Sequence, residues 1–164
     1  MQDEGVKRLA ERVAELAVAG VQIGVAESLT SGALASALGA APEASTWFTG
    51  GVVAYEKKVK FEVLGVTPGP VISERCAREM AAGASQLLGA HVVAAVTGVG
   101  GPGPEEGQPA GTVFLAHGPV DAVVVDQLSL YGEPTEIVEQ TVTAALTALI
   151  DDLGARTERQ PRQR

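Results

Sequence analysis

The chain has 164 residues, 46% of them hydrophobic and only 4% aromatic, which suits one domain whose core is built from aliphatic side chains. Its formal net charge of −8 argues against sequence-independent nucleic-acid binding, which needs a basic surface. No apolar run approaches the roughly 20 residues that span a bilayer, and the acidic N-terminus is not a signal peptide. A single cysteine, Cys76, excludes a disulfide within the chain and fits a cytoplasmic protein.

The spacing of apolar residues predicts alternating helices and strands. In the first half we expect a helix over residues 6–20, a strand over 21–25, a short helix ending at 38, a strand over 51–55 and a helix or strand extension over 57–64. In the second half we expect a helix over 73–88, a strand over 91–96, a loop over 97–111, strands over 112–116 and 122–130, and a helix over 134–154. Helix caps are expected at Thr30 or Ser31 and at Ser73, with Gly89 as a stop.

This alternation predicts an α/β fold, specifically a three-layer α/β/α sandwich. The two late strands follow each other so closely that they have to be antiparallel, so we expect a mixed, mostly parallel sheet. The domain should cover residues 1–154. Residues 155–164 carry four arginines without periodic apolar positions and are expected to form a disordered basic tail.

Three polar segments stand out from an otherwise Ala- and Val-rich sequence. They are residues 26–32, residues 55–60 and the Gly-rich loop that begins at residue 97. Each follows a run that is typical of a buried strand, and ligands of α/β proteins bind at strand ends. Together they offer a nucleophile, a base and a loop of backbone amides, which favours an enzyme.

Ser28 lies where a strand is expected to give way to a helix. Backbone N–H groups at a helix start can activate a hydroxyl and stabilise an oxyanion. The segment is not the Gly-x-Ser-x-Gly elbow, because Ala26 and Thr30 occupy the glycine positions. Taken alone, the segment favours simple helix capping over a nucleophile.

A serine nucleophile needs a base, and the chain offers two kinds. The candidates are two histidines and three clustered lysines: His91, His117, Lys57, Lys58 and Lys60. A lysine acts as a base only when desolvation or a cationic neighbour lowers its pKa from about 10.4. Because Glu56 and Glu62 are interleaved with the lysines, the cluster alone favours a solvated charged turn.

The loop after residue 96 contains Gly98, Gly100 and Gly103 at the spacing of a dinucleotide-binding fingerprint. Pro102 and Pro104 oppose the helix that this fingerprint requires, so a Rossmann site is not expected. The glycines instead suit close approach of backbone amides to a ligand. No cluster of His, Cys or carboxylate residues has metal-ligand spacing, and no metal or cofactor is expected.

The three segments together resemble the CinA C-terminal domain family, also called the nicotinamide-nucleotide amidohydrolase (PncC) family. The matching motifs are Ala26-Glu27-Ser28-Leu29-Thr30, Gly50-Gly51-Val52-Val53-Ala54-Tyr55 with Lys60, and Thr97-Gly98-Val99-Gly100-Gly101-Pro102. The similarity extends to residues 109–113 and 138–149, so it covers nearly everything except the two ends.

The resemblance implies a bacterial enzyme of pyridine nucleotide salvage that deamidates nicotinamide mononucleotide to nicotinate mononucleotide and ammonia. It implies a metal-free mechanism in which Ser28 is the nucleophile, Lys60 the base and Tyr55 their polar partner. The substrate-binding positions are Glu27, Thr30, Ser45, Thr97, Gly98, Gly100 and Gly101. It also implies the stand-alone form of the domain, without the nucleotide-processing domain that many members carry.

The chain departs from the family pattern before its last helix. Gly132-Glu133-Pro134 stands where Gly-Asp-Arg is common, which removes a basic residue near the expected anchor of an anionic substrate. Glu43 replaces a usual glycine and Gly100 a common alanine. Two other functions therefore stay open, a non-catalytic nucleotide-binding or regulatory module and an amidase for a different amide. The expected partners are a small-molecule nucleotide and, given the Ala-rich surface, further copies of the chain in a homo-oligomer, with neither nucleic acid nor membrane.

Overall fold

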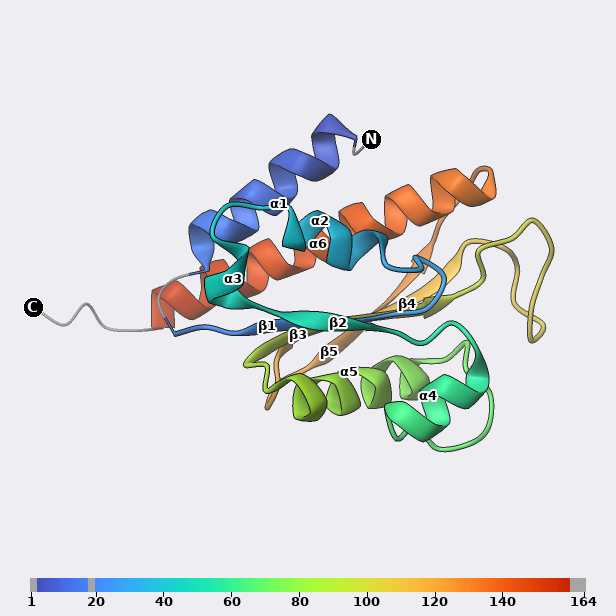
Figure 1. The fold of residues 1–164 in the computed structure, drawn as a ribbon. Coiled ribbons are helices and arrows are strands. Elements are labelled where there is room, and N and C mark those ends of the chain that lie inside the picture. Colours follow the sequence, from blue (N-terminus) through green and yellow to red (C-terminus); the bar gives the residue numbers. More distant parts are fainter. Residues whose placement is uncertain (1–2, 18–19, 160–164) are drawn as a thin grey trace, which may run out of the picture.

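A five-stranded sheet forms the centre of the protein, whose computed structural model describes residues 3–17 and 20–159 (Figure 1). The strands are β1 (Ile23–Glu27), β2 (Phe48–Val53), β3 (Val92–Gly98), β4 (Thr112–Pro119) and β5 (Val124–Ser129). The helices are α1 (Glu4–Leu16), α2 (Ala33–Gly39), α3 (Ala44–Trp47), α4 (Lys57–Val63), α5 (Glu74–Leu88) and α6 (Pro134–Arg159). Among the described residues no helix has both the length and the apolar surface that crossing a bilayer requires.

The strand order is β2-β1-β3-β4-β5, and the sheet is mixed. Strand β1 pairs in parallel with β2 and β3, whereas β4 is antiparallel to β3 and β5 is antiparallel to β4. The α/β class and the antiparallel late pair are confirmed, but the expectation of a mostly parallel sheet is wrong, because only half of the pairings are parallel. A parallel strand needs a crossover connection, usually a helix, and residues 99–111 between β3 and β4 contain none.

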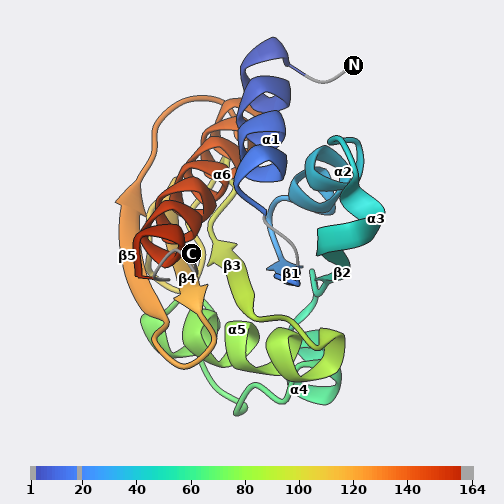
Figure 2. The ribbon, with the colours of Figure 1, turned by 90° about the vertical axis from the view of Figure 1, so that its left-hand side faces the viewer.

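Helices cover both faces of the sheet (Figures 1 and 2). Helices α1, α2, α3 and α6 lie on one face, and α4 and α5 lie on the other. Each face has its own apolar core: Ile23 and Val25 of β1 pack toward the first group, and Ala26 packs with Met80 of α5. All residues of β1 are buried for this reason, since a strand covered on both faces has no solvent-facing side.

The parallel arrangement of β1, β2 and β3 brings three strand ends to one edge of the sheet. Glu27 pairs with Val53, and Ala26 pairs with Ala95 near the end of β3. The segments that begin with Ser28, Tyr55 and Gly98 therefore leave the sheet at the same edge. Ligands of α/β proteins bind at this edge, outside the carboxyl ends of the strands.

Several local predictions can be compared with the structure. The cap of α5 is confirmed, since Ser73 accepts a hydrogen bond from the backbone N–H of Cys76 (3.1 Å) and Gly89 ends the helix in the left-handed region (φ 64°). Helix α3 was not predicted, and β2 begins at Phe48, earlier than expected. Four residues are too few for a periodic pattern, so the sequence carries no signal for α3.

The last helix does not end near Gly154 but continues to Arg159, so residues 155–159 are not the disordered tail that we expected. Alanine and arginine are strong helix formers, and basic residues in a last turn stabilise the C-terminal end of a helix. Thr157 also donates a side-chain hydrogen bond to the Leu153 carbonyl (3.0 Å). Residues 160–164 lie outside the described part of the chain.

Candidate active site

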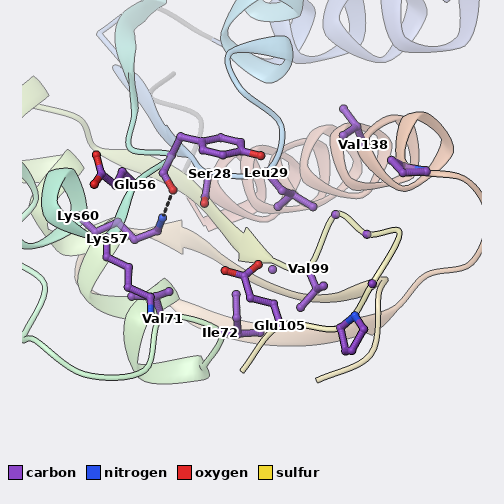
Figure 3. Close-up of a pocket in the computed structure, with 17 residues that line it drawn as sticks. Ser28, Leu29, Glu56, Lys57, Lys60, Val71, Ile72, Val99, Glu105 and Val138 are labelled. Atoms are coloured by element: carbon purple, nitrogen blue, oxygen red, sulfur yellow. Dashed lines mark hydrogen bonds between the residues drawn. The ribbon is translucent and has the colours of Figure 1, made fainter. Parts of the chain in front are cut away.

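A cavity of about 620 Å³ lies at the edge where β1, β2 and β3 end (Figure 3). Six of the residues singled out from the sequence line it: Ser28, Tyr55, Lys60, Gly98, Gly100 and Gly101. They come from all three polar segments, which are far apart in the chain. The topology of the sheet therefore brings the three motifs into one site.

Ser28 follows directly after β1, in a tight turn before α2. Its carbonyl accepts a hydrogen bond from the N–H of Ser31 (3.1 Å), and Ser31 adopts the left-handed conformation that closes the turn (φ 52°). The side chain of Ser28 points into the cavity, although the residue is buried. The turn thus presents the Ser28 hydroxyl to a ligand.

Lys60 is buried at the cavity wall, with only 1% of its surface exposed. Its ammonium nitrogen Nζ donates to the carbonyl of Ala54 (2.7 Å) and to that of Tyr55 (2.9 Å). Lys57 and Lys58 are exposed. The solvated turn that the sequence favoured is therefore correct for two of the three lysines and wrong for Lys60, whose side chain turns inward to donate to the two carbonyls that follow β2.

Burial lowers the pKa of Lys60 below its ordinary value of 10.5, because the charged form loses hydration and no carboxylate contacts it directly. A thiolate at Cys76 would oppose this shift, the carboxylates of Glu105 and Glu106 oppose it, and the charge of Lys57 adds to it. Burial also raises the pKa of Cys76 to about 11. The thiol is therefore neutral at physiological pH, so it does not restore the charge of Lys60.

Tyr55 contacts Lys60 through its backbone and not through its phenol. The carbonyl accepts the hydrogen bond from Nζ, while the side chain lies at the rim of the cavity with 68% of its surface exposed. The phenol is thus placed to meet a ligand or a leaving group rather than to hold the lysine.

Glu27 and Thr30 were expected to bind substrate, but neither lines the cavity. The carboxylate of Glu27 is fully buried and accepts hydrogen bonds from the N–H groups of Leu34 (2.9 Å) and Ala35 (3.0 Å) and from the Thr30 hydroxyl (2.6 Å). Glu27 thus satisfies the free N–H groups at the start of α2, the role expected of Thr30 or Ser31. A carboxylate with three donors has no reason to turn toward a ligand, so this pair positions the Ser28 turn.

Ser45 and Thr97 also lie apart from the cavity lining. Ser45 is an exposed residue of α3, which precedes β2, so it lies at the amino ends of the parallel strands and away from Ser28. Thr97 is fully buried, and its hydroxyl donates to the carbonyl of Val71 (2.8 Å). It fixes the segment that carries Val71, which does line the cavity.

Strand β3 ends in a glycine, Gly98, because its backbone packs closely against β4 at the start of the Gly-rich loop. A Cβ at Gly98 would lie 2.5 Å from the Thr112 carbonyl oxygen and 2.8 Å from Cα of Val113, so no side chain fits. Farther along the loop, the carboxylate of Glu106 accepts hydrogen bonds from the N–H groups of Val71 and Ile72 (2.7 Å each) and lies 3.8 Å from Nζ of Lys57. Glu106 therefore joins three segments of the cavity wall.

The two histidines that were candidate bases lie elsewhere. Nδ1 of His91 accepts a hydrogen bond from the N–H of Gln22 (3.0 Å) at the amino end of β3. His117 lies between Asp126 and Asp152, 2.9 Å and 2.8 Å away, and does not line the cavity. Of the bases considered from the sequence, only lysine shares the cavity with Ser28.

Sequence reasoning missed several cavity residues, among them Glu105, Val71, Ile72, Pro134 and Val138. Val71 and Ile72 precede the α5 cap and have no motif of their own. Val138 was interpreted only as part of the last helix, whereas Pro134 belongs to the Gly132-Glu133-Pro134 departure, which was expected near the substrate anchor. Glu105 had one signal, a carboxylate in a Gly- and Pro-rich loop between two strands, which deserved notice because such loops carry function.

The model of the CinA C-terminal domain matches residues 6–153. The chain belongs to the CinA C-terminal domain family. It is 39% identical over 160 residues to the CinA-like protein of Mycobacterium avium, a match that covers 91% of this chain and 37% of that protein. For the CinA-like protein of Frankia casuarinae the identity is 40%, over 76% of this chain and 30% of that protein. The chain thus spans about a third of the length of the curated relatives it matches.

Solved structures of the CinA family share the fold along their whole length. A competence-damaged protein (CinA) superfamily protein from Klebsiella pneumoniae is 34% identical with a TM-score of 0.87, covering 94% of this chain and 99% of that one. The competence/damage-inducible protein of Agrobacterium tumefaciens is 32% identical with a TM-score of 0.85, covering 94% of this chain and 98% of that one. Family membership and fold thus agree.

Proposed function

We propose that this CinA-family domain is an amidohydrolase that deamidates nicotinamide mononucleotide, giving nicotinate mononucleotide and ammonia. The observation that carries the proposal is the state of Lys60, a buried amine with a lowered pKa that shares a cavity with the Ser28 hydroxyl. A buried neutral amine beside a serine is the requirement for general-base activation of that serine.

The hydrogen bonds of Lys60 support its role as a base. A neutral amine has two N–H groups and one lone pair, and the carbonyls of Ala54 and Tyr55 provide two acceptors. With both N–H groups engaged, the lone pair is the part of the nitrogen left to accept a proton. Backbone carbonyls also do not favour the charged form as strongly as a carboxylate would, which suits a base that works near neutral pH.

In the proposed reaction the amine nitrogen of Lys60 accepts and returns the proton in each step. Ser28 Oγ attacks the carboxamide carbon while Lys60 takes the hydroxyl proton. As the C–N bond breaks, Lys60 returns this proton to the departing nitrogen, which leaves as ammonia, and an ester remains on Ser28. A water molecule gives a proton to Lys60 as it attacks the ester, and Lys60 returns the proton to Ser28 Oγ as the carboxylic acid leaves.

The cavity also offers donors for the oxyanion that forms during attack. Leu29 and Gly100 line the cavity, and within the described ranges 3–17 and 20–159 their backbone N–H groups make no hydrogen bond, so both groups are available to a ligand. Such preorganised amides stabilise the tetrahedral intermediate without reorganisation. The apolar side chains of Val71, Ile72 and Val99 form walls that suit a flat aromatic ring.

A second candidate is the same deamidation on an unphosphorylated amide such as nicotinamide riboside. The cationic side chains that line the cavity are Lys57 and Lys60, and Lys57 is paired with Glu106. Pro134, which lines the cavity, stands where a basic residue is common in the family, and Glu133 lies directly before it. This distribution of charge favours a substrate with less negative charge than a phosphate monoester.

The test is ammonia release from nicotinamide mononucleotide and from nicotinamide riboside, with Ser28→Ala as the matched control. We expect the wild type to release ammonia and Ser28→Ala to lose at least about 10³-fold in kcat with unchanged circular dichroism. The ratio of kcat/KM for the two substrates decides between the candidates. No release from either by a folded wild type would contradict the proposed function and favour a non-catalytic binding module.

A further inference from the structure

One carboxylate of the cavity has no task in the chemistry described so far. Two glutamates line the cavity, Glu56 and Glu105, and they differ in orientation. Figure 3 shows the carboxylate of Glu56 turned away from the cavity, whereas that of Glu105 rises from the Gly-rich loop into it, toward Ser28.

The Glu105 carboxylate is also free to bind a ligand. In the described part of the chain no hydrogen bond or ion pair engages it, although Glu106 beside it is held by Val71, Ile72 and Lys57. Two backbone hydrogen bonds fix Glu105 against Gln108. The N–H of Glu105 donates to the Gln108 carbonyl (3.0 Å), and the N–H of Gln108 donates to the Glu105 carbonyl (2.9 Å). A rigid backbone therefore presents an unpaired carboxylate to the substrate space.

The surroundings of Glu105 favour a cation as its partner. When Lys60 is neutral, it no longer compensates a negative charge in the cavity. Lys57 does not take its place, because its nitrogen lies at the wall against Glu106. A carboxylate that lines the cavity without a fixed counter-ion attracts a positive charge that arrives with the ligand, and because Glu105 is an exposed residue, water screens part of that attraction.

We infer that Glu105 is a specificity-determining residue that recognises the positive charge of a pyridinium ring bearing the carboxamide. This inference rests on the proposed function and names the feature of the substrate that the site selects. In nicotinamide nucleotides and nucleosides the ring nitrogen is bonded to ribose, so the ring is cationic and its charge lies within a few atoms of the carboxamide. A carboxylate that faces Ser28 thus meets the ring when the carboxamide reaches the nucleophile.

The test compares two ligands that differ in ring charge. Nicotinamide mononucleotide has a cationic ring, and its reduced dihydropyridine form keeps the phosphate, ribose and carboxamide on a neutral ring. Dissociation constants are measured by calorimetry on Ser28→Ala protein, which prevents turnover, with and without Glu105→Gln. Glu62→Gln, an exposed residue of α4 outside the cavity, removes the same charge as a control.

We expect the Ser28→Ala protein to bind the cationic nucleotide about fivefold more tightly than the reduced one, the effect of one water-exposed charge contact. Glu105→Gln should abolish this difference by weakening only the cationic ligand, and Glu62→Gln should leave it intact. No preference in the parent, or an equal loss for both ligands in Glu105→Gln, overturns the inference while deamidation stands. If the parent binds neither nucleotide and the wild type releases no ammonia, the proposed function fails and this inference with it.

Discussion

Lys60 and His117 are both buried bases, yet their surroundings shift their pKa values in opposite directions. Lys60 is 1% exposed and donates to two backbone carbonyls, and burial lowers its pKa. His117 is 9% exposed and has a carboxylate at each ring nitrogen. The hydrogen bond to Asp152 is the largest cause that raises its pKa; burial opposes it and Asp126 adds to it.

The comparison shows that the partner, and not burial alone, decides whether a buried base is charged. With a carboxylate at each nitrogen, both ring nitrogens can donate only in the protonated imidazolium, so these contacts favour the charged form and raise the pKa of His117. His117 thereby joins β4 to Asp126 of β5 and Asp152 of α6, far from the cavity lining. Lys60 has only neutral acceptors, so its proton can leave and return.

The largest expected effect is that of removing the base. Lys60→Met keeps an unbranched apolar stem and removes the amine, and kcat for ammonia release should fall by about 10³-fold. Loss of the amine leaves two carbonyls without their donor, so a cost of about 1–3 kcal/mol in stability is also expected. Thermal unfolding and single-substrate kinetics measure the two effects.

The matched control is Lys58→Met, which removes an exposed amine two residues away. This variant should keep kcat within about twofold of the wild-type value, since the substitution of an exposed residue rarely disturbs the structure elsewhere. Normal turnover by Lys60→Met would show that the buried amine is only a packing group.

A smaller effect, but one specific to the charge state of Lys60, is the dependence of kcat/KM on pH. Only the neutral amine accepts the proton, so the rate should rise with pH and level off at the pKa of Lys60, falling about tenfold for each pH unit below it. Because burial lowers this pKa, the plateau should begin below pH 10.5. Product formation followed by chromatography across the pH range tests this, and a plateau that begins only near 10.5 would indicate a solvated lysine.

The smallest effects are expected on stability, at His117. Its raised pKa means that the folded state holds the proton more tightly, so the stabilisation is complete below the ordinary value of 6.5 and is lost as pH rises through the raised value. His117→Gln should lower the free energy of unfolding by about 1–3 kcal/mol below pH 6.5 and remove this slope. Urea unfolding between pH 5 and about 9 measures both.

Substituting Asp126 and Asp152 one at a time separates their contributions to the stabilisation by His117. The side chain of Asp152 is 16% exposed and that of Asp126 is 57% exposed. Asp152→Asn should therefore shift the His117 titration more than Asp126→Asn, whose cost should stay below about 1 kcal/mol because water screens an exposed pair. Equal effects would mean that the more exposed contact is as strong as the buried one. An unchanged slope in His117→Gln would show that other groups set the pH dependence.

Local sequence patterns predicted most of the elements, though not α3, and the three segments that meet at the site. Apolar periodicity indicates β1, α5 and most of α6, because long patterned stretches have few alternative structures. The strand-end position of Ser28, the Gly-rich loop and the lysine cluster are visible as residue types in order along the chain. These features depend on local spacing, which a sequence contains.

Which side chains contact one another, and which are buried, depends on the tertiary structure. The lysine cluster looks solvated in the sequence, and it is the packing of α4 against the sheet edge that buries Lys60 and leaves Lys58 in water. Glu27 looks like a binding residue, but the turn after β1 places its carboxylate under the start of α2. The partners of His117 come from β5 and α6, 9 and 35 residues away. Charge state and role depend on neighbours brought together by folding, and neither is encoded in the local pattern.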